Sequence, residues 1–309
     1  MRAVAITRPG GPDVLEIVER ADRDPGRGEV RIAVRAAAVN PTDVLMRQGG
    51  GGDLPQPWIP GMDAAGTIEA VGEGVDRFAV GDEVMAAASP RRPDGGAQAE
   101  RLVVPAASVV PIPDGASLEE AATLPMNGLT AKLGLELLGL EPGSTLAVSG
   151  GAGLLASYVI PLAKAAGLRV VADAKPEDVD LVRGFGADEI VPRSDDFGAA
   201  VRAAVPEGVD GVYDTALLHE RVFCGLRDGG TTVVVRGWAP DHTERDIVVR
   251  QVMVRDALER TEWLDELRAL VSDGRIRLRV AQTFPVDQVG AAQDLMDAGG
   301  LRGRAVLVF

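Results

Sequence analysis

The chain of 309 residues has very few side chains that could bind a transition metal or form a disulfide. It contains one cysteine, Cys224, and two histidines, His219 and His242, so neither residue type occurs in residues 1–218. One cysteine forms no internal disulfide, and zinc in proteins is held mainly by sets of cysteine and histidine side chains. The composition therefore excludes a cysteine–histidine zinc site in residues 1–218, and we assign no role to the two isolated histidines.

Basic clusters and long apolar runs are also missing. The formal net charge is −14, and no cluster of lysine and arginine could neutralise phosphates, so we expect no nucleic-acid partner. Glycine, proline and charged residues interrupt the apolar runs before they reach the length that spans a bilayer, and the N-terminus lacks the layout of a signal peptide. We expect a cytoplasmic protein with no membrane partner.

The residues that are present indicate two domains. Hydrophobic residues make up 46% and charged residues 25%, as in ordinary folded proteins, and 309 residues exceed what one core usually holds. Up to about residue 108, apolar runs such as Val30–Arg35 and Glu83–Ala87 alternate with turn residues, which predicts an irregular β domain. Helical spacing begins near Leu118, where Ser117 and Glu120 have the spacing of a capping box.

From about Thr145 to Val235 apolar strands alternate with helices, which is typical of a parallel sheet covered on both faces. The following residues predict a helix, a strand over Arg275–Phe284, a second helix and a final strand over Arg304–Phe309. We therefore predict an α/β fold in which a doubly wound parallel sheet accompanies a β-rich domain, and we expect the C-terminal tail to return to that domain.

The sequence GAGLLA at 151–156 fits the G-x-G-x-x-G/A pattern of dinucleotide-binding proteins, and it lies between a predicted strand and an apolar helix. The first glycine permits a tight turn, the second lets backbone N–H groups approach a pyrophosphate, and Ala156 permits close packing of the helix. The predicted cofactor-binding residues of this turn are Gly151, Ala152, Gly153, Leu154 and Leu155.

Three charged residues are candidates for the adenosine ribose. Asp173 ends the strand after the glycine turn, where a carboxylate favours NAD because it accepts hydrogen bonds from the ribose hydroxyls. Lys175 and Arg193 follow this strand and the next one, and cations there favour the 2′-phosphate of NADP. Both types occur, so the residues leave the choice open, and we predict NADPH with NADH as the alternative.

Five segments, taken in order, resemble the zinc-free quinone oxidoreductase branch of the medium-chain dehydrogenase/reductase superfamily. They are AAAVNPTDVLMRQG (36–49), PGMDAAGTIEAVGEGVDRFAVGDEV (60–84), GGAQAERLVV (95–104), LPMNGLTA (124–131) and the C-terminal residues 274–309. The resemblance implies a GroES-like catalytic domain in residues 1–122, completed by residues 265–309. It also implies a Rossmann domain in residues 123–264 and an active cleft where the two domains meet.

The resemblance further implies site residues outside the glycine turn. Asn40 and Asp43 match a family segment that lines the nicotinamide and substrate cleft, and Thr130 matches a residue near the nicotinamide-side phosphate. Arg236 and Gly237 correspond to a strand end that passes near the nicotinamide. The competing interpretations are a turn-stabilising element at Asn40 and Asp43 and a buried helix hydroxyl at Thr130.

These residues predict an NADPH-dependent oxidoreductase that reduces a quinone or an α,β-unsaturated carbonyl compound by hydride transfer without a metal. The alternatives are a catalytically silent, nucleotide-binding redox sensor and a carbonyl reductase of the alcohol dehydrogenase type. No side chain is a convincing proton donor, because Tyr158 and Tyr213 both lie in predicted packing positions. We expect a homodimer formed through an edge strand within Asp246–Val254.

Overall fold

The computed structural model describes residues 1–309 and divides into two compact units, Met1–Met126 with Arg255–Phe309, and Asn127–Val254. The domain boundaries expected from the sequence were 122/123 and 264/265. The chain re-enters the first unit before residue 264 because the helix α7 (Thr261–Ser272) packs against that unit, where the Thr261 hydroxyl donates to the Ala107 carbonyl at 2.6 Å.

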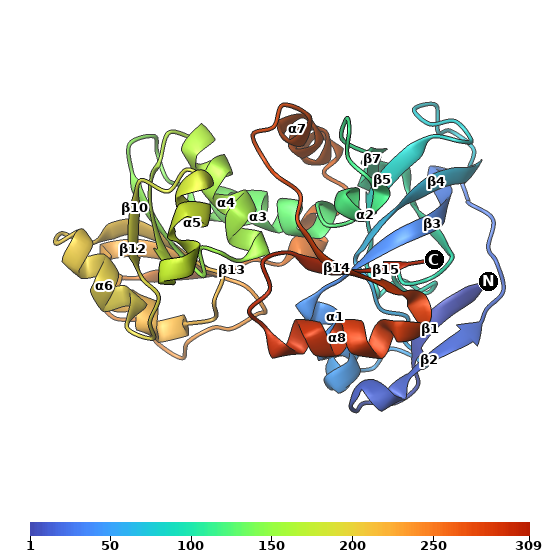
Figure 1. Cartoon of the computed structure of the whole chain (residues 1–309), viewed down its shortest axis with the longest axis horizontal. Coiled ribbons are helices and arrows are strands. Elements are labelled where there is room, and N and C mark those ends of the chain that lie inside the picture. The colour runs from blue at the N-terminus through green and yellow to red at the C-terminus, as the bar shows by residue number, and fades with distance from the viewer. The chain divides into compact units, whose positions relative to one another are not determined.

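The first unit is built on a seven-stranded sheet with the order β14-β15-β3-β4-β5-β7, in which β6 also pairs with β3 (Figure 1). Its elements are β1 (Arg2–Ile6), β2 (Leu15–Glu19), β3 (Glu29–Val39), α1 (Pro41–Leu45), β4 (Asp63–Val71), β5 (Glu83–Ala87), β6 (Arg101–Pro105), β7 (Val109–Pro111), α2 (Leu118–Ala121), α7, β14 (Val280–Pro285), α8 (Val289–Ala298) and β15 (Arg304–Val308). The apolar side chains of β3 alternate toward the core, with Val30, Ile32 and Val34 buried.

The first unit contains the residues of the predicted capping box at Ser117 and of the predicted strand over Arg275–Phe284. The capping box is confirmed, since the Glu120 N–H donates to the Ser117 hydroxyl at 3.2 Å and the Glu120 carboxylate accepts from the Ser117 N–H at 3.0 Å. The strand predicted over Arg275–Phe284 is wrong at its start, because β14 begins at Val280. The N–H groups of Arg275 and Ile276 both donate to the Leu270 carbonyl and close the end of α7 instead.

The C-terminal tail completes the first sheet, as predicted. β15 pairs antiparallel with β3, with Leu307 opposite Ala37, and parallel with β14. Leu307 and Ala305 are fully buried with Val39 and Phe284 in one apolar cluster. Residues more than 260 positions apart in the chain therefore share one core.

The second unit contains a six-stranded, entirely parallel sheet with the order β10-β9-β8-β11-β12-β13 (Figure 1). Its elements are α3 (Pro125–Leu138, which begins at the boundary), β8 (Thr145–Ser149), α4 (Leu154–Ala165), β9 (Arg169–Ala174), α5 (Val179–Gly184), β10 (Glu189–Pro192), α6 (Phe197–Ala204), β11 (Val209–Asp214), β12 (Leu226–Val234) and β13 (Val248–Gln251). The strand order reverses between β8 and β11, which makes that edge a topological switch point.

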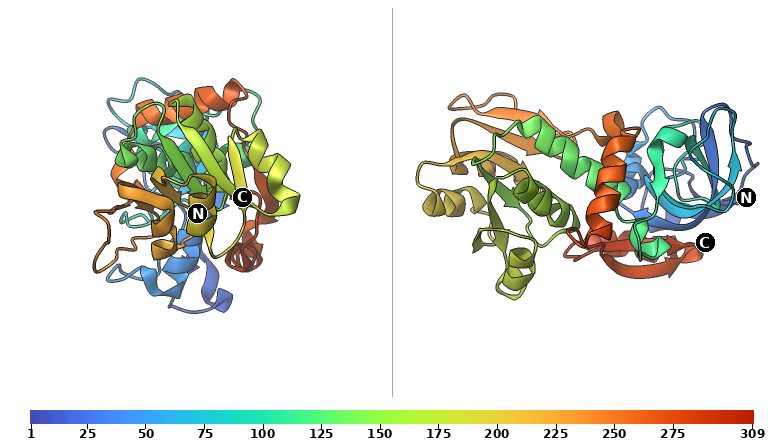
Figure 2. Two further views of the ribbon diagram at one scale, coloured as in Figure 1. Left: turned by 90° about the vertical axis from the view of Figure 1, so that its left-hand side faces the viewer. Right: turned by 90° about the horizontal axis from the view of Figure 1, so that it is seen from above.

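The strands of this sheet are covered on both faces. Successive residues of a strand point to opposite faces, and Val170, Val171, Ala172 and Asp173 are all fully buried. The helices α4, α5 and α6 pack against the strands (Figure 2). This arrangement confirms the predicted Rossmann doubly wound sheet.

No helix of the structure combines the length and the apolar character needed to cross a membrane.

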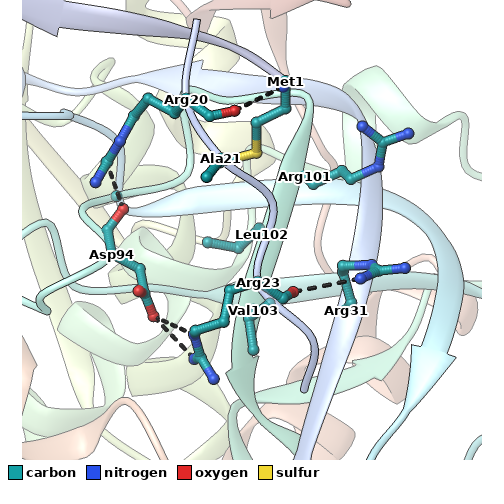
Figure 3. Close-up of a pocket in the computed structure, with 10 residues that line it drawn as sticks. Met1, Arg20, Ala21, Arg23, Arg31, Asp94, Arg101, Leu102 and Val103 are labelled. Atoms are coloured by element: carbon teal, nitrogen blue, oxygen red, sulfur yellow. Dashed lines mark hydrogen bonds and ion pairs between the residues drawn. The ribbon is translucent and has the colours of Figure 1, made fainter.

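A small pocket of the first unit is lined by several arginines (Figure 3). Arg23 donates to the Asp94 carboxylate at 2.8 Å and to both oxygens of Glu29 at 2.7 and 3.1 Å, and Arg92 also reaches Glu29 at 2.9 Å. Arg20 donates to the Asp94 carbonyl. The arginines are therefore paired within the protein, and we interpret the pocket as part of a salt-bridge network.

This network predicts an acid-sensitive contribution to stability. The hydrogen bonds from Arg23 are the main reason that the pKa of Glu29 is lowered to about 2. A lowered pKa stabilises the fold above the unfolded value of 4.5, and the stabilisation is lost as the pH falls toward 2. We expect Glu29→Gln to lower the free energy of unfolding at pH 7 by about 1–3 kcal/mol and to remove this acid dependence. Urea unfolding checks this, with the exposed Glu207→Gln as the control; equal losses in both variants would contradict it.

Candidate functional site

The glycine turn of the second unit connects the buried end of β8 to α4. Gly150 carries the left-handed backbone, with a φ of 71°, and Gly153 immediately precedes α4. A Cβ on Gly151 would lie 2.4 Å from the Asp173 carbonyl oxygen, so β9 leaves room only for glycine. The tight turn that we attributed to Gly151 therefore depends on Gly150, and Gly151 permits close approach to β9. Ala156 is fully buried, as close packing of α4 requires.

This turn presents the N-terminus of α4 at the carboxyl edge of the sheet. The first N–H groups of a helix have no partner within it and carry partial positive charge, which favours a bound phosphate. Leu154 and Leu155 form the start of α4 with Ala152 and Gly153 just before them. The predicted cofactor-binding residues 151–155 therefore lie together, in the turn and at the start of α4.

Asp173 is committed to two contacts within the protein. One carboxylate oxygen accepts from the Gly151 N–H at 2.9 Å, and the other forms an ion pair with Arg193 at 2.8 Å. Asp173 is fully buried, whereas the side chain of Arg193 is 36% exposed. The structure thus brings together three of the predicted residues, and the carboxylate holds both the glycine turn and the cation.

The other predicted residues of this unit lie at separate strand ends. Lys175 is exposed just after β9, and Arg236 and Gly237 are exposed after β12, where both have positive φ values of 65° and 72°. The positive φ of Arg236 is uncommon for a residue with a side chain and marks a strained turn. No hydrogen bond or ion pair joins the side chain of Lys175 to Asp173 or Arg193.

Sequence reasoning missed a polar cluster at the switch point. The Asp214 carboxylate accepts from the Ser149 hydroxyl at 2.7 Å and from the backbone N–H of His219 at 2.8 Å, while the Thr215 hydroxyl donates to the Ser149 carbonyl at 2.5 Å. The imidazole of His219 stacks on Trp238 with ring centres 4.6 Å apart. The only available signal was the position of these residues after predicted parallel strands.

Thr130 lies in α3 and is 7% exposed. Its carbonyl accepts a hydrogen bond from the Tyr213 hydroxyl at 2.6 Å, and a Cβ on Gly134 would meet the ring of Tyr213 at 2.3 Å. Tyr213 is fully buried, and burial raises the pKa of its hydroxyl. These contacts support our interpretation of Tyr213 as a packing residue, whereas the role of Thr130 stays a prediction.

In the first unit, Asn40 and Asp43 belong to a buried polar network. The Asp43 carboxylate accepts from the Asn40 N–H at 2.7 Å, the Gly61 N–H at 2.9 Å and the Gln98 amide at 3.1 Å. Asn40 and Asp43 are at most 1% exposed. The hydrogen bonds fix the start of α1, which favours a positioning role for Asp43 over direct contact with a substrate.

A second buried carboxylate, Asp63, completes this network and was not predicted. It accepts from the Asn40 amide at 2.7 Å and from the Met126 N–H at 2.5 Å, and the Asn40 amide oxygen in turn accepts from Arg304 at 2.9 Å. Burial is the main reason that the pKa of Asp43 is raised to about 6 and that of Asp63 to about 7. Neighbouring N–H groups and the Arg304 charge offset only part of this effect.

The two raised pKa values predict that the protein loses stability as the pH rises. A raised pKa stabilises the fold below the unfolded value of 3.8, and this stabilisation is lost as the pH passes about 6 and about 7. Each pKa unit corresponds to about 1.4 kcal/mol, so we expect a decline of several kcal/mol over this pH range. Asp63→Asn should remove most of the decline, because the amide does not ionise.

Urea unfolding at several pH values between about 4 and 8 checks this expectation. Asp53→Asn is the matched control, because Asp53 is exposed and outside the network. A pH profile that is the same in Asp63→Asn and in the wild type would show that Asp63 does not ionise in this range.

Comparisons with known proteins identify the family. Residues 26–114 match the alcohol dehydrogenase GroES-like domain, and residues 185–307 match the zinc-binding dehydrogenase family. The chain is 31% identical to a quinone oxidoreductase of Pseudomonas aeruginosa, with 97% of each chain covered. It is 30% identical to the 2-methylene-furan-3-one reductase of Solanum lycopersicum, with 99% of this chain and 79% of the relative covered.

A solved structure agrees with these matches. A mycobacterial protein complexed with NADPH superposes with a TM-score of 0.88 at 28% identity, and the whole of both chains is covered. The similarity thus extends over both units and over the glycine turn between β8 and α4. The chain therefore belongs to the medium-chain dehydrogenase/reductase superfamily, in its quinone oxidoreductase branch.

Proposed function

We propose that this protein transfers a hydride from NADPH to a quinone or an α,β-unsaturated carbonyl compound without a metal. The observation that carries the proposal is the glycine turn held against β9 by Asp173 beside the partly exposed Arg193. The family relatives named as a quinone oxidoreductase and as a furanone reductase, and the NADPH complex of a structural neighbour, support the same choice of cofactor and substrate class.

The residues present fit a dinucleotide. The N-terminus of α4 favours a pyrophosphate, Gly151 has no side chain to obstruct the turn, and Arg193 supplies a cation for the 2′-phosphate. We propose further contacts from Lys175, Arg236 and Gly237 at the neighbouring strand ends. When bound, NADPH supplies the hydride, so the protein itself must mainly orient the reactants and exclude water.

The proposal of metal-free chemistry rests on the side chains of this sequence. Cysteine and histidine are the usual ligands of zinc in proteins, and residues 1–218 contain neither. The buried polar network around Asn40 in the first unit consists of carboxylates and amides that are already hydrogen-bonded to one another. We propose that Asn40 and Asp43 position the loop around α1, and that Thr130 serves the nicotinamide side of the site.

Turnover tests this proposal. The full chain, prepared in the presence of a chelator, is titrated with NADPH and NADH by fluorescence and then given a panel of quinones, enones and simple ketones. We expect tighter binding of NADPH and its oxidation by quinones or enones. Binding without turnover would instead indicate a redox sensor, reduction of ketones alone would indicate a carbonyl reductase, and loss of activity with the chelator would contradict metal-free chemistry.

We also propose a homodimer that forms through β13. This strand is at the edge of the parallel sheet, and Val248 in it is a large apolar side chain with 38% exposure. An exposed edge strand can pair with its own copy across a two-fold axis. We expect sedimentation as a dimer at micromolar concentration and a shift toward monomer in Val248→Asp; a wild-type monomer would contradict this. The cytoplasmic location stays a prediction.

A further inference from the structure

Arg47 is a buried arginine with no partner in the protein. It lies in the short helical segment Met46–Gly50 that continues α1, and it is 2% exposed. Its Nε atom is buried without a hydrogen bond, and no ion pair or hydrogen bond reaches its guanidinium. Arg23 and Arg92, by contrast, are paired with carboxylates. A buried charge without a partner is strongly unfavourable, so such a group is expected to serve a ligand.

The position of Arg47 is fixed by its surroundings. Its carbonyl accepts from the Gly10 N–H at 3.0 Å, which ties the segment to the loop between β1 and β2. Its neighbour Met46 is buried in an apolar cluster with Ile6, Val14 and Trp58. The backbone of Arg47 is therefore anchored by this hydrogen bond and by the packing of Met46 beside it.

A second buried polar side chain without a partner lies on the neighbouring helix. Gln293 in α8 is fully buried, and both its amide nitrogen and its amide oxygen lack hydrogen bonds. α8 packs against α1, the helix that leads into the segment of Arg47 (Figure 1). The guanidinium thus follows directly after α1, the carboxamide is on the helix that packs against α1, and both groups can donate hydrogen bonds to an anion.

We infer that Arg47, together with Gln293, binds a small organic monocarboxylate. The planar guanidinium matches the two oxygens of a carboxylate in a bidentate pair. A phosphate is usually held by several backbone N–H groups, whereas the N–H groups of Gly52 and Leu54 beside this segment already donate to Gly49 and Gly51. The site belongs to the first unit and goes beyond the proposed hydride transfer.

Thermal unfolding and calorimetry of the full chain test this site without any turnover. Sodium acetate and sodium benzoate are compared with acetamide and benzamide at matched ionic strength, and inorganic phosphate is tested in parallel. We expect the carboxylates alone to raise the melting temperature, since a ligand that binds only the folded state stabilises it. Arg47→Met should weaken carboxylate binding roughly 10- to 100-fold, and Gln293→Met should weaken it less.

The variants also have a readout without ligand. Arg47→Met should melt at a higher temperature than the wild type, because it replaces an unpaired buried charge with an apolar side chain of similar length. Arg277 is exposed, so Arg277→Met is the matched control and should change neither the melting temperature nor the affinity for carboxylates. If Arg47→Met does not fold, Arg47→Lys keeps the charge without the planar fork and should still bind carboxylate more weakly. The site would be overturned if carboxylates and amides gave the same melting temperature. It would also be overturned if carboxylates raised the melting temperature of the wild type and of an Arg47 variant by the same amount. A larger increase with phosphate than with the carboxylates would show that the ligand is not a carboxylate.

Discussion

Replacing Gly151 with alanine should reduce the affinity for NADPH by on the order of 100-fold or more. The added Cβ would lie 2.4 Å from the Asp173 carbonyl, which is a backbone atom of β9 and cannot simply rotate away. The turn must therefore move, and with it both the Gly151 N–H that Asp173 binds and the start of α4. Fluorescence titration with NADPH measures the effect.

Gly184→Ala is the matched control for this variant. Gly184 is the last residue of α5, and a Cβ there would meet nothing within 4 Å. We expect it to bind NADPH as the wild type does and to be no less stable. Wild-type affinity in Gly151→Ala would mean that the turn does not hold the nucleotide.

Arg193→Gln should lower the affinity for NADPH roughly 10- to 100-fold and leave the affinity for NADH nearly unchanged. The side chain is partly exposed and is held in place by the buried Asp173, so it can present its remaining N–H groups to a 2′-phosphate. NADH lacks this phosphate and makes no use of the cation. Fluorescence titration of the variant and the wild type with both nucleotides gives the ratio of the NADPH affinity to the NADH affinity.

Asp173→Asn separates the two roles of the carboxylate. The amide oxygen can still accept from the Gly151 N–H, but the charge that pairs with Arg193 is removed. We expect the preference of this variant for NADPH over NADH to be weaker than that of the wild type, because the ion pair that holds Arg193 in place is lost. If Arg193→Gln weakens both nucleotides equally, the arginine supports the fold of the turn and does not select the cofactor.

The sequence predicted the features of the second unit that depend on local patterns. Alternating apolar runs indicated the parallel strands, and the glycine spacing located the turn before α4. It also placed Asp173 and Arg193 at the ends of successive strands, but it did not predict the ion pair between them. That contact depends on the register of β9 and β10, in which Asp173 lies opposite Val191, and register is a long-range property.

The polar network of the first unit shows the limit of such reasoning. Asp63 stands at the start of a strand in PGMDAAG, where a charged residue is normally interpreted as exposed. Its burial depends on Asn40, 23 positions earlier, and on the Met126 N–H, 63 positions later. Arg47 was missed for the same reason, since nothing in the local pattern of MRQGG indicates that a cation is buried there.

The most direct test of the proposed reaction is the fate of the transferred hydrogen. NADPH that carries deuterium at both hydrogen positions of the nicotinamide C4 is incubated with the protein and an enone, and the product is analysed by mass spectrometry. We predict one deuterium at the β-carbon of the saturated ketone, at a rate that Gly151→Ala strongly reduces and Gly184→Ala does not. A saturated product without deuterium, or no consumption of NADPH by any quinone or enone, would contradict hydride transfer by this protein.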